Sequence, residues 1–169
     1  FWDLFVYVFF EFLIHIQKPE SLKADISSSS DWTLDKNELE SMFNSRTRLI
    51  ILNTPHNPTG KVYTIIFRKS EKGLFLFLIE KVFTRDELEQ IANLCQKHDV
   101  LCISDEVYEW IVYDENKKHI RIATLPDMWD RTLTIGSAGK TFSSTGLKIG
   151  WTIGPDHLLR QCRIVHQVN

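Results

Sequence analysis

Three short apolar runs constrain the fold of this chain more than any other feature, because each of them leads directly into polar residues. The runs cover residues 48–52, 100–104 and 132–135, and they are followed by NTPHNPTG, DEVY and GSAGK. Compact apolar runs that end in turn residues are typical of buried strands. The pattern therefore predicts three strands that carry polar groups at their carboxyl ends.

Helical segments separate these predicted strands. Thr84 and Glu87 have the spacing of a capping box, so a helix is predicted from residue 84 to about His98. Its apolar positions share one face: Leu88, Ile91, Ala92 and Cys95. A shorter helix is predicted after Asp35, with three apolar side chains on one face: Leu39, Met42 and Phe43. Strand–helix–strand spacing of this kind predicts an α/β fold with a mainly parallel sheet flanked by helices.

One stretch, residues 63–82, interrupts this pattern. The string KVYT at 61–64 returns as KVFT at 81–84, and the segment between them predicts a hairpin that pairs residues 65–67 with residues 74–79. The second arm is apolar and uncharged, which is a composition typical of aggregation-prone strands. Residues 17–33 are polar and are predicted to form a loop.

The polar residues after the three strands are the candidate site. In an open α/β sheet, ligands bind outside the carboxyl ends of the strands. Five side chains are therefore expected to gather at one edge of the sheet: Asn57, Asp105, Tyr108, Ser137 and Lys140.

Lys140 and Asp105 together match the requirements of one cofactor. Pyridoxal phosphate needs a lysine that bonds it covalently and a carboxylate that faces its pyridine nitrogen. A buried anion stabilises the protonated ring, and that proton makes the ring an electron sink. Lys148, eight positions after Lys140, is placed for a phosphate contact. Taken singly, Asp105 also fits a helix cap or a surface acid, and either lysine also fits a solvated loop.

The motifs resemble those of the large domain of class I/II aminotransferases. The resemblance rests on NPTG at 57–60, DEVY at 105–108 and SAGKTFS at 137–143, and residues 99–160 resemble the kynurenine aminotransferase group. It covers roughly residues 27–62 and 83–167, within a partial large domain at 20–62 and 83–169. Residues 1–19 and 63–82 do not share the resemblance, and the latter is expected to be an insertion, with both segments hypothesised to be translated intron or mispredicted exon.

The resemblance implies a role for each candidate residue. Lys140 would bond pyridoxal 5'-phosphate and move the substrate's α-proton, while Asp105 would pair with the pyridine nitrogen. Asn57 and Tyr108 would hydrogen-bond the phenolic oxygen of the ring. Ser137 and Lys148 would hold the phosphate.

The resemblance also implies a reaction and a partner. The expected reaction is a ping-pong transfer of an amino group from kynurenine, glutamine or an aromatic amino acid to a 2-oxo acid, with β-elimination of cysteine conjugates as a side reaction. The family implies a homodimer. Family segments before and after this stretch, including the arginine that clamps the substrate carboxylate, are not found, so this chain alone is expected to have little or no activity.

Two rival interpretations remain open. The first is a truncated module that binds the cofactor or a partner without catalysis. The second is serine acylation, because residues 137–140 fit Ser-x-x-Lys, although the companion SDN and KTG motifs are not found.

Composition narrows the class further. The chain has 169 residues, 43% of them hydrophobic, with a formal net charge of −2. These values predict one core and no nucleic-acid partner, since there is no basic stripe. The apolar residues 1–16 are shorter than the roughly 20 needed to span a membrane, so no membrane role is expected. Three scattered cysteines are too few for a disulfide framework or a metal site, and Cys95 and Cys102 are predicted to be buried free thiols. A reducing compartment is therefore expected, cytoplasmic or alternatively mitochondrial.

Overall fold

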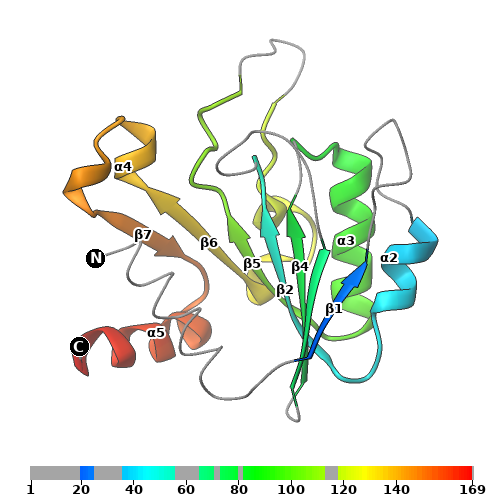
Figure 1. Ribbon diagram of the computed structural model, residues 1–169. Helices are drawn as coiled ribbons and strands as arrows, with labels where there is room; N and C mark the ends of the chain where they lie inside the picture. Colours follow the sequence, from blue (N-terminus) through cyan, green and yellow to red (C-terminus); the bar gives the residue numbers. More distant parts are fainter. Residues whose placement is uncertain are drawn as a thin grey trace.

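The fold is a single twisted sheet with helices packed on one face, as the computed structural model shows (Figure 1). The structure describes residues 20–24, 36–55, 65–70, 73–79, 82–112 and 118–168, with the side chains of residues 20–24, 38, 65–70, 73–79 and 168 left aside. Its strands and helices are, in chain order, β1 (Glu20–Ala24), α2 (Lys36–Met42), β2 (Thr47–Asn53), β3 (Ile65–Ser70), β4 (Gly73–Ile79), α3 (Arg85–Lys97), β5 (Leu101–Asp105), η1 (Ile122–Thr124), η2 (Trp129–Arg131), β6 (Thr132–Ser137), α4 (Ala138–Thr141), η3 (Thr145–Leu147), β7 (Gly150–Ile153) and α5 (Asp156–Val168).

The sheet has the order β1-β3-β4-β2-β5-β6-β7 in the described part of the chain. Strands β4, β2, β5 and β6 are mutually parallel, which confirms the predicted parallel core. β7 pairs antiparallel with β6, and β1 pairs antiparallel with β3. The prediction of a loop over residues 17–33 was therefore wrong for residues 20–24. This short polar segment forms a strand because it pairs with β3, which lies far from it in the sequence.

The hairpin predicted between residues 65 and 79 is present, with longer arms than expected. β3 and β4 pair antiparallel, and β4 also pairs in parallel with β2, from Thr47 opposite Leu74 to Asn53 opposite Ile79. The sequence of β4, GLFLFLI, suits a strand with neighbours on both sides, since such strands are continuous apolar runs. The hairpin is thus part of the main sheet.

The helix predicted after Thr84 is confirmed in detail. Thr84 Oγ1 accepts the backbone N–H of Glu87, and the Glu87 carboxylate accepts the backbone N–H of Thr84. The helix ends at Lys97, with His98 as its C-terminal cap. Five side chains on its inner face are buried: Leu88, Ile91, Ala92, Leu94 and Cys95.

The main core lies between the sheet and helices α2 and α3. Leu39 of α2, Ile50 of β2 and Ile91 of α3 belong to the same cluster of buried side chains, and each is at most 1% exposed. Each such side chain contributes about 1.5–3 kcal/mol to folding. A smaller cluster occupies the opposite face of the sheet: Leu49, Ile51 and Ile103, with Leu133 and Ile135 packed against it.

Helix α5 lies at the edge of the molecule, near β7 (Figure 1). Within the described ranges, no helix is both long and apolar enough to cross a membrane. Within the same ranges, no group of three or more His, Cys, Asp or Glu side chains is placed to hold a metal ion.

Candidate active site

Asp105 ends the central strand β5 and is held there from both sides. In the sheet register it lies opposite Asn53 of β2 and Ile135 of β6. The backbone is fixed beyond the strand as well, because Thr54 N donates to Asp105 O at 3.1 Å and Glu106 N donates to Ile135 O at 2.9 Å. Asp105 thus lies at the carboxyl ends of three parallel strands, which is where the sequence predicted the site.

The Asp105 side chain is half-buried, and its carboxylate makes two hydrogen bonds. Oδ1 accepts the Val107 backbone N–H at 3.3 Å, and Oδ2 accepts Asn53 Nδ2 at 3.5 Å. Burial raises the pKa of Asp105 from 3.8 to about 6; the Val107 N–H opposes this rise, Glu106 adds to it, and the Lys140 ammonium opposes it. The Asp105 carboxyl therefore remains mostly ionised at neutral pH. A further cation placed beside it would stabilise this ionised form.

Lys140 and Tyr108 meet beside this acid. The ammonium nitrogen Nζ of Lys140 lies 5.7 Å from the centroid of the Tyr108 ring, which is within the range of a cation–π contact. Tyr108 follows Asp105 by three residues in a turn over 107–110, and Lys140 lies close enough to lower the pKa of Asp105. The structure thus brings together Asp105, Tyr108 and Lys140.

The backbone around Lys140 is helical. β6 continues to Ser137, and Lys140 lies in the short helix α4 that begins directly after it. Gly139 permits this compact arrangement, since a Cβ there would lie 3.1 Å from Thr145 Cα. The lack of a side chain at Gly139 therefore allows close packing of α4 against η3.

Ser137 and Lys148 lie on the two sides of the β6–β7 connection. Ser137 pairs with Gly150 in the β6–β7 register, and its side chain is half-buried. Lys148 is exposed and has a left-handed backbone, with φ of 52°. Ala138 N donates to Ile149 O at 3.0 Å, which closes the connection next to both residues. Asn57, the remaining predicted site residue, lies outside the described residues.

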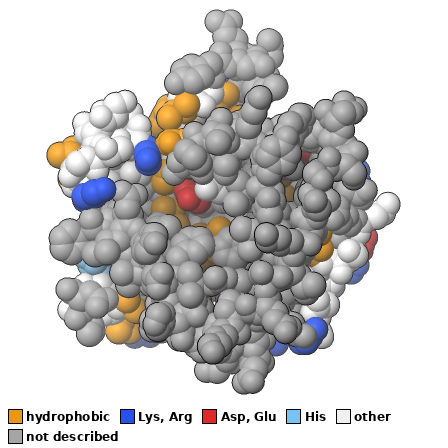
Figure 2. Space-filling model, in the orientation of Figure 1, with side chains coloured by type: hydrophobic (Ala, Val, Ile, Leu, Met, Phe, Trp, Pro, Cys, Tyr) orange, Lys and Arg blue, Asp and Glu red, His pale blue; other side chains and the backbone are white. Residues whose placement is uncertain are grey.

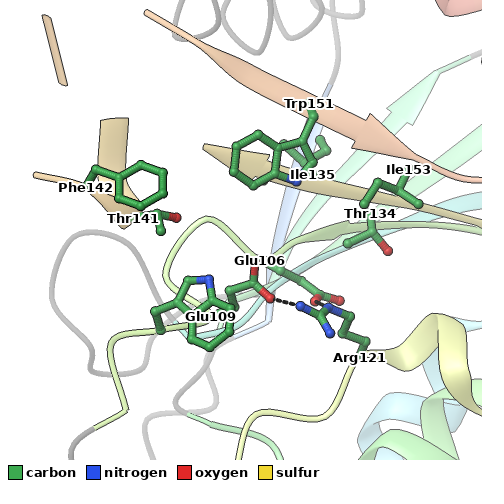
Figure 3. Close-up of a pocket in the computed structure, with 11 residues that line it drawn as sticks. Glu106, Glu109, Arg121, Thr134, Ile135, Thr141, Phe142, Trp151 and Ile153 are labelled. Carbon is green, nitrogen blue, oxygen red and sulfur yellow. Dashed lines mark hydrogen bonds and ion pairs between the residues drawn. The ribbon is translucent and has the colours of Figure 1, made fainter. Parts of the chain in front are cut away.

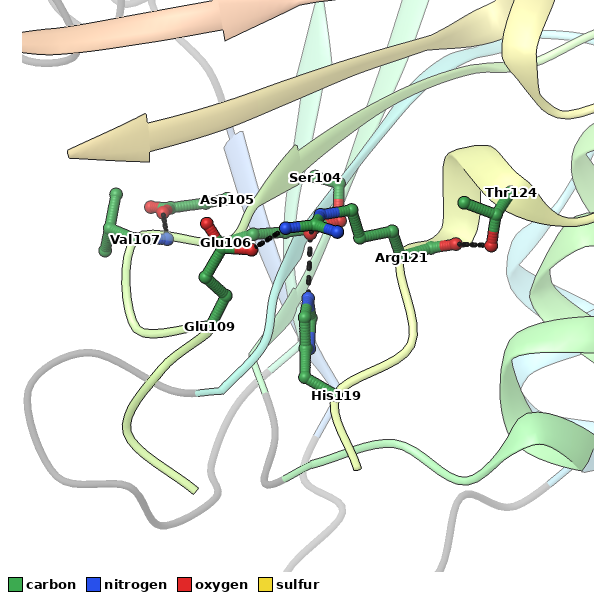
Figure 4. A network of polar contacts seen from close by, with 8 residues as sticks. All are labelled: Ser104, Asp105, Glu106, Val107, Glu109, His119, Arg121 and Thr124. Carbon is green, nitrogen blue, oxygen red and sulfur yellow. Dashed lines mark hydrogen bonds and ion pairs between the residues drawn. The ribbon is translucent and has the colours of Figure 1, made fainter. Parts of the chain in front are cut away.

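Two polar features near Asp105 were missed by the sequence reasoning. The first is Asn53, whose contact with Asp105 depends on the register of two strands. The second is a cluster around Glu106, which is 1% exposed (Figure 4). Ser104 Oγ donates to Glu106 Oε1 at 2.8 Å, and His119 Nε2 lies 2.7 Å from Glu106 Oε2. No sequence motif points to His119, and the only signal for its partner is an acid, Glu106, directly after Asp105 at the end of β5.

A cavity of about 540 Å³ lies beside this cluster (Figure 3). The Glu109–Arg121 ion pair lies on one side of it, and Trp151 and Phe142 lie on the other. None of the predicted site residues that the structure describes lines this cavity. The cavity therefore lies next to the Asp105–Lys140 group, and these residues do not surround it.

The sheet resembles that of solved aminotransferases. The N-succinyldiaminopimelate aminotransferase from Mycobacterium tuberculosis matches 80% of this chain with a TM-score of 0.62 and 34% sequence identity, over 30% of its own chain. The chain belongs to the aminotransferase class I and II family, whose model matches residues 6–66 and 81–168.

Curated relatives are more similar still. Kynurenine–oxoglutarate transaminase 3 from Homo sapiens is 59% identical over 140 residues, which are 83% of this chain and 26% of the relative. Kynurenine–oxoglutarate transaminase 1 from Homo sapiens is 54% identical over 151 residues, which are 89% of this chain and 31% of the relative. The chain thus spans about a quarter to a third of the length of these relatives.

Proposed function

We propose that this chain carries the cofactor side of an aminotransferase site. The reaction transfers an amino group from kynurenine, glutamine or an aromatic amino acid to a 2-oxo acid, and a cysteine conjugate with a leaving group on its β-carbon undergoes elimination at the same site. The observation that carries the proposal is the half-buried Asp105 carboxylate with Lys140 and Tyr108 beside it at the sheet edge. Of these amino donors, the names of the relatives support kynurenine.

The described residues fit pyridoxal 5'-phosphate by their chemistry. A carboxylate accepts about four hydrogen bonds, and the two long contacts to Val107 and Asn53 leave Asp105 able to accept another from a cationic N–H. When bound, the cofactor supplies an electron sink for charge that develops on the substrate's α-carbon. Asp105 is the residue proposed to hold the proton on the pyridine nitrogen, since an opposite charge stabilises the protonated form.

Lys140, Tyr108 and the phosphate residues have separate tasks in this proposal. Lys140 Nζ would hold the cofactor and would move the α-proton of the amino acid substrate. The Tyr108 hydroxyl, together with the Asn57 amide, donates to the phenolic oxygen. Ser137 and Lys148 hold the phosphate. A homodimer is proposed as well, on the strength of family membership.

A second candidate is a cofactor-binding module that does not catalyse amino transfer. It concerns the 169 residues taken alone, which match 26% of the length of the human transaminase 3. In that case the 169 residues would bind the cofactor through Asp105 and Lys140 without productive binding of the substrate carboxylate, and little turnover is expected.

One experiment tests both candidates. The purified 169-residue chain is mixed with pyridoxal phosphate, its visible absorbance is recorded, and the bond is trapped with borohydride and located by peptide mapping. Label at Lys140 with amino transfer supports the enzyme, and label without transfer supports the module. Lys140→Ala should abolish the label. Lys97→Ala is the matched control, because Lys97 lies on α3 in an exposed ion pair with Glu40. Label spread evenly over surface lysines would refute both.

A further inference from the structure

Arg121 contacts two carboxylates that lie on either side of Tyr108. Its Nε lies 3.6 Å from Glu106 Oε2, and its Nη2 donates to Glu109 Oε2 (Figure 4). The two carboxylate side chains are 1% and 12% exposed, so both partners are shielded from water. Between them the chain forms a tight turn, in which Glu109 N donates to Glu106 O at 2.9 Å and Ile111 N donates to Tyr108 O at 2.8 Å.

Arg121 itself is anchored to the main core. Its carbonyl oxygen accepts the Thr124 backbone N–H at 2.9 Å and the Thr124 hydroxyl at 2.7 Å, so it forms the start of η1. Ile122 in η1 and Met128 after it are fully buried in the cluster shared with α3. His119 adds a second tie from the same segment to Glu106. A continuous set of contacts therefore joins the core to the turn that carries Tyr108.

We propose that Arg121 is a positioning residue: by holding Glu106 and Glu109 together it fixes the 107–110 turn and so sets where Tyr108 meets Lys140. The part of this proposal that concerns the Tyr108 hydroxyl rests on the proposed function. The part that concerns the turn stands on the contacts alone.

The two-point contact explains why arginine is needed here. A guanidinium presents several N–H groups in a fixed plane and reaches two acceptors at once, whereas the ammonium of lysine is a single point charge. Removing Arg121 leaves Glu106 with its Ser104 and His119 contacts. The substitution Arg121→Gln is thus expected to loosen the turn at Glu109, while the more deeply buried Glu106 keeps two partners.

The first test measures hydrogen exchange in the full 169-residue chain without cofactor. In Arg121→Gln, amides of residues 106–111 should exchange about tenfold faster or more, while those of α3 keep the wild-type rate. Arg85→Gln is the matched control, because Arg85 forms an exposed pair with Glu89 on α3 and should leave the turn unchanged. If Arg121→Gln fails to fold, Glu109→Gln breaks the same contact from the other side and should loosen the turn likewise.

The second test uses the chain loaded with pyridoxal phosphate. A loosened Tyr108 should move the midpoint of the pH titration of visible absorbance in the direction that Tyr108→Phe moves it, by about one pH unit or less. The double variant should show no further shift beyond Tyr108→Phe. Arg121→Lys keeps the charge but loses the two-point contact, so it should behave like Arg121→Gln if position matters.

The outcomes separate the possibilities. Wild-type exchange in the turn of Arg121→Gln, or faster exchange throughout α3 as well, would overturn the positioning role. If the midpoint of the absorbance titration is shifted in Arg121→Gln but keeps its wild-type value in Arg121→Lys, then Arg121 acts through its charge and not through its two-point contact. Failure of the chain to bind pyridoxal phosphate would count against the proposed function, and the exchange measurement would still decide on the turn.

Discussion

Asn53 and Asp105 lie opposite each other in the parallel register of β2 and β5, and the amide of one donates to the carboxylate of the other at 3.5 Å. An amide does not titrate in the physiological range, so Asn53 orients the acid without neutralising its charge. The Val107 N–H acts in the same way from the other oxygen. The two hydrogen bonds thereby orient the Asp105 carboxylate and leave its negative charge available to a cationic ligand.

Loss of this amide should weaken cofactor binding. Asn53→Ala removes one hydrogen bond to a charged group, so the Kd for pyridoxal phosphate is expected to rise about fivefold, near 1 kcal/mol. Absorbance titration measures the change. Asn93→Ala, on the exposed side of α3, is the control and should bind as wild type does. An unchanged Kd in Asn53→Ala would show that the amide does not orient Asp105.

Asp105 should make the stability of the cofactor-free chain depend on pH. Its pKa is 3.8 unfolded and about 6 folded, so the folded state binds the proton more tightly and stability falls as pH rises from about 4 to 6. The shift corresponds to about 3 kcal/mol. Asp105→Asn should therefore be more stable than wild type at pH 8, by up to that amount, and nearly equal to it at pH 4. Urea unfolding at both pH values measures this, and an equal difference at the two would contradict it.

Two glycines near the site form a matched pair. A Cβ on Gly136 would collide with the indole ring of Trp151, whereas a Cβ on Gly146 has no atom within 4 Å among the described residues. Gly136→Ala is expected to cost about 1–3 kcal/mol of unfolding free energy and to change Trp fluorescence. Gly146→Ala should leave stability within about 0.5 kcal/mol of wild type. Equal stabilities for the two variants would mean that Trp151 moves aside freely.

The three thiols should differ in reactivity. Burial raises the pKa of Cys95 to about 12 and that of Cys102 well above its usual range, whereas Cys162 on α5 is only half-buried. A thiol reagent at pH 8 should therefore modify Cys162 first, and Cys162→Ser should remove the fast phase. All three should react at similar rates in urea. If all three thiols of the native chain reacted in the fast phase, the core around Cys95 and Cys102 would be open to the reagent.

Local pattern accounts for what was predicted correctly. The capping box of Thr84 and Glu87 and the apolar face behind it identify α3, and short apolar runs identify β2, β5 and β6. These signals act over a few residues, so one sequence is enough to find them. The proximity of Asp105, Tyr108 and Lys140 follows from the same logic, because parallel strands end at a common edge, while their roles toward a cofactor stay predictions.

Long-range contacts account for what was missed. β7 has the half-buried sequence GWTI, which carries no strong strand signal until β6 is beside it. The contact between His119 and Glu106 depends on the path of the chain between the two residues, and no sequence motif predicts it. The same is true of Asn53, whose role is decided by a register that only the assembled sheet defines.

The alternation of side chains along β5 has one more consequence. Asp105 and its neighbour Glu106 are adjacent acids with separate partners, Asn53 for the first and Ser104 for the second. Mispairing β5 by a single position would exchange their sides and set the wrong carboxylate toward Lys140. Binding of a cationic ring at this edge of the sheet would therefore show that β5 has paired in the correct register. No catalytic assay is needed for that conclusion.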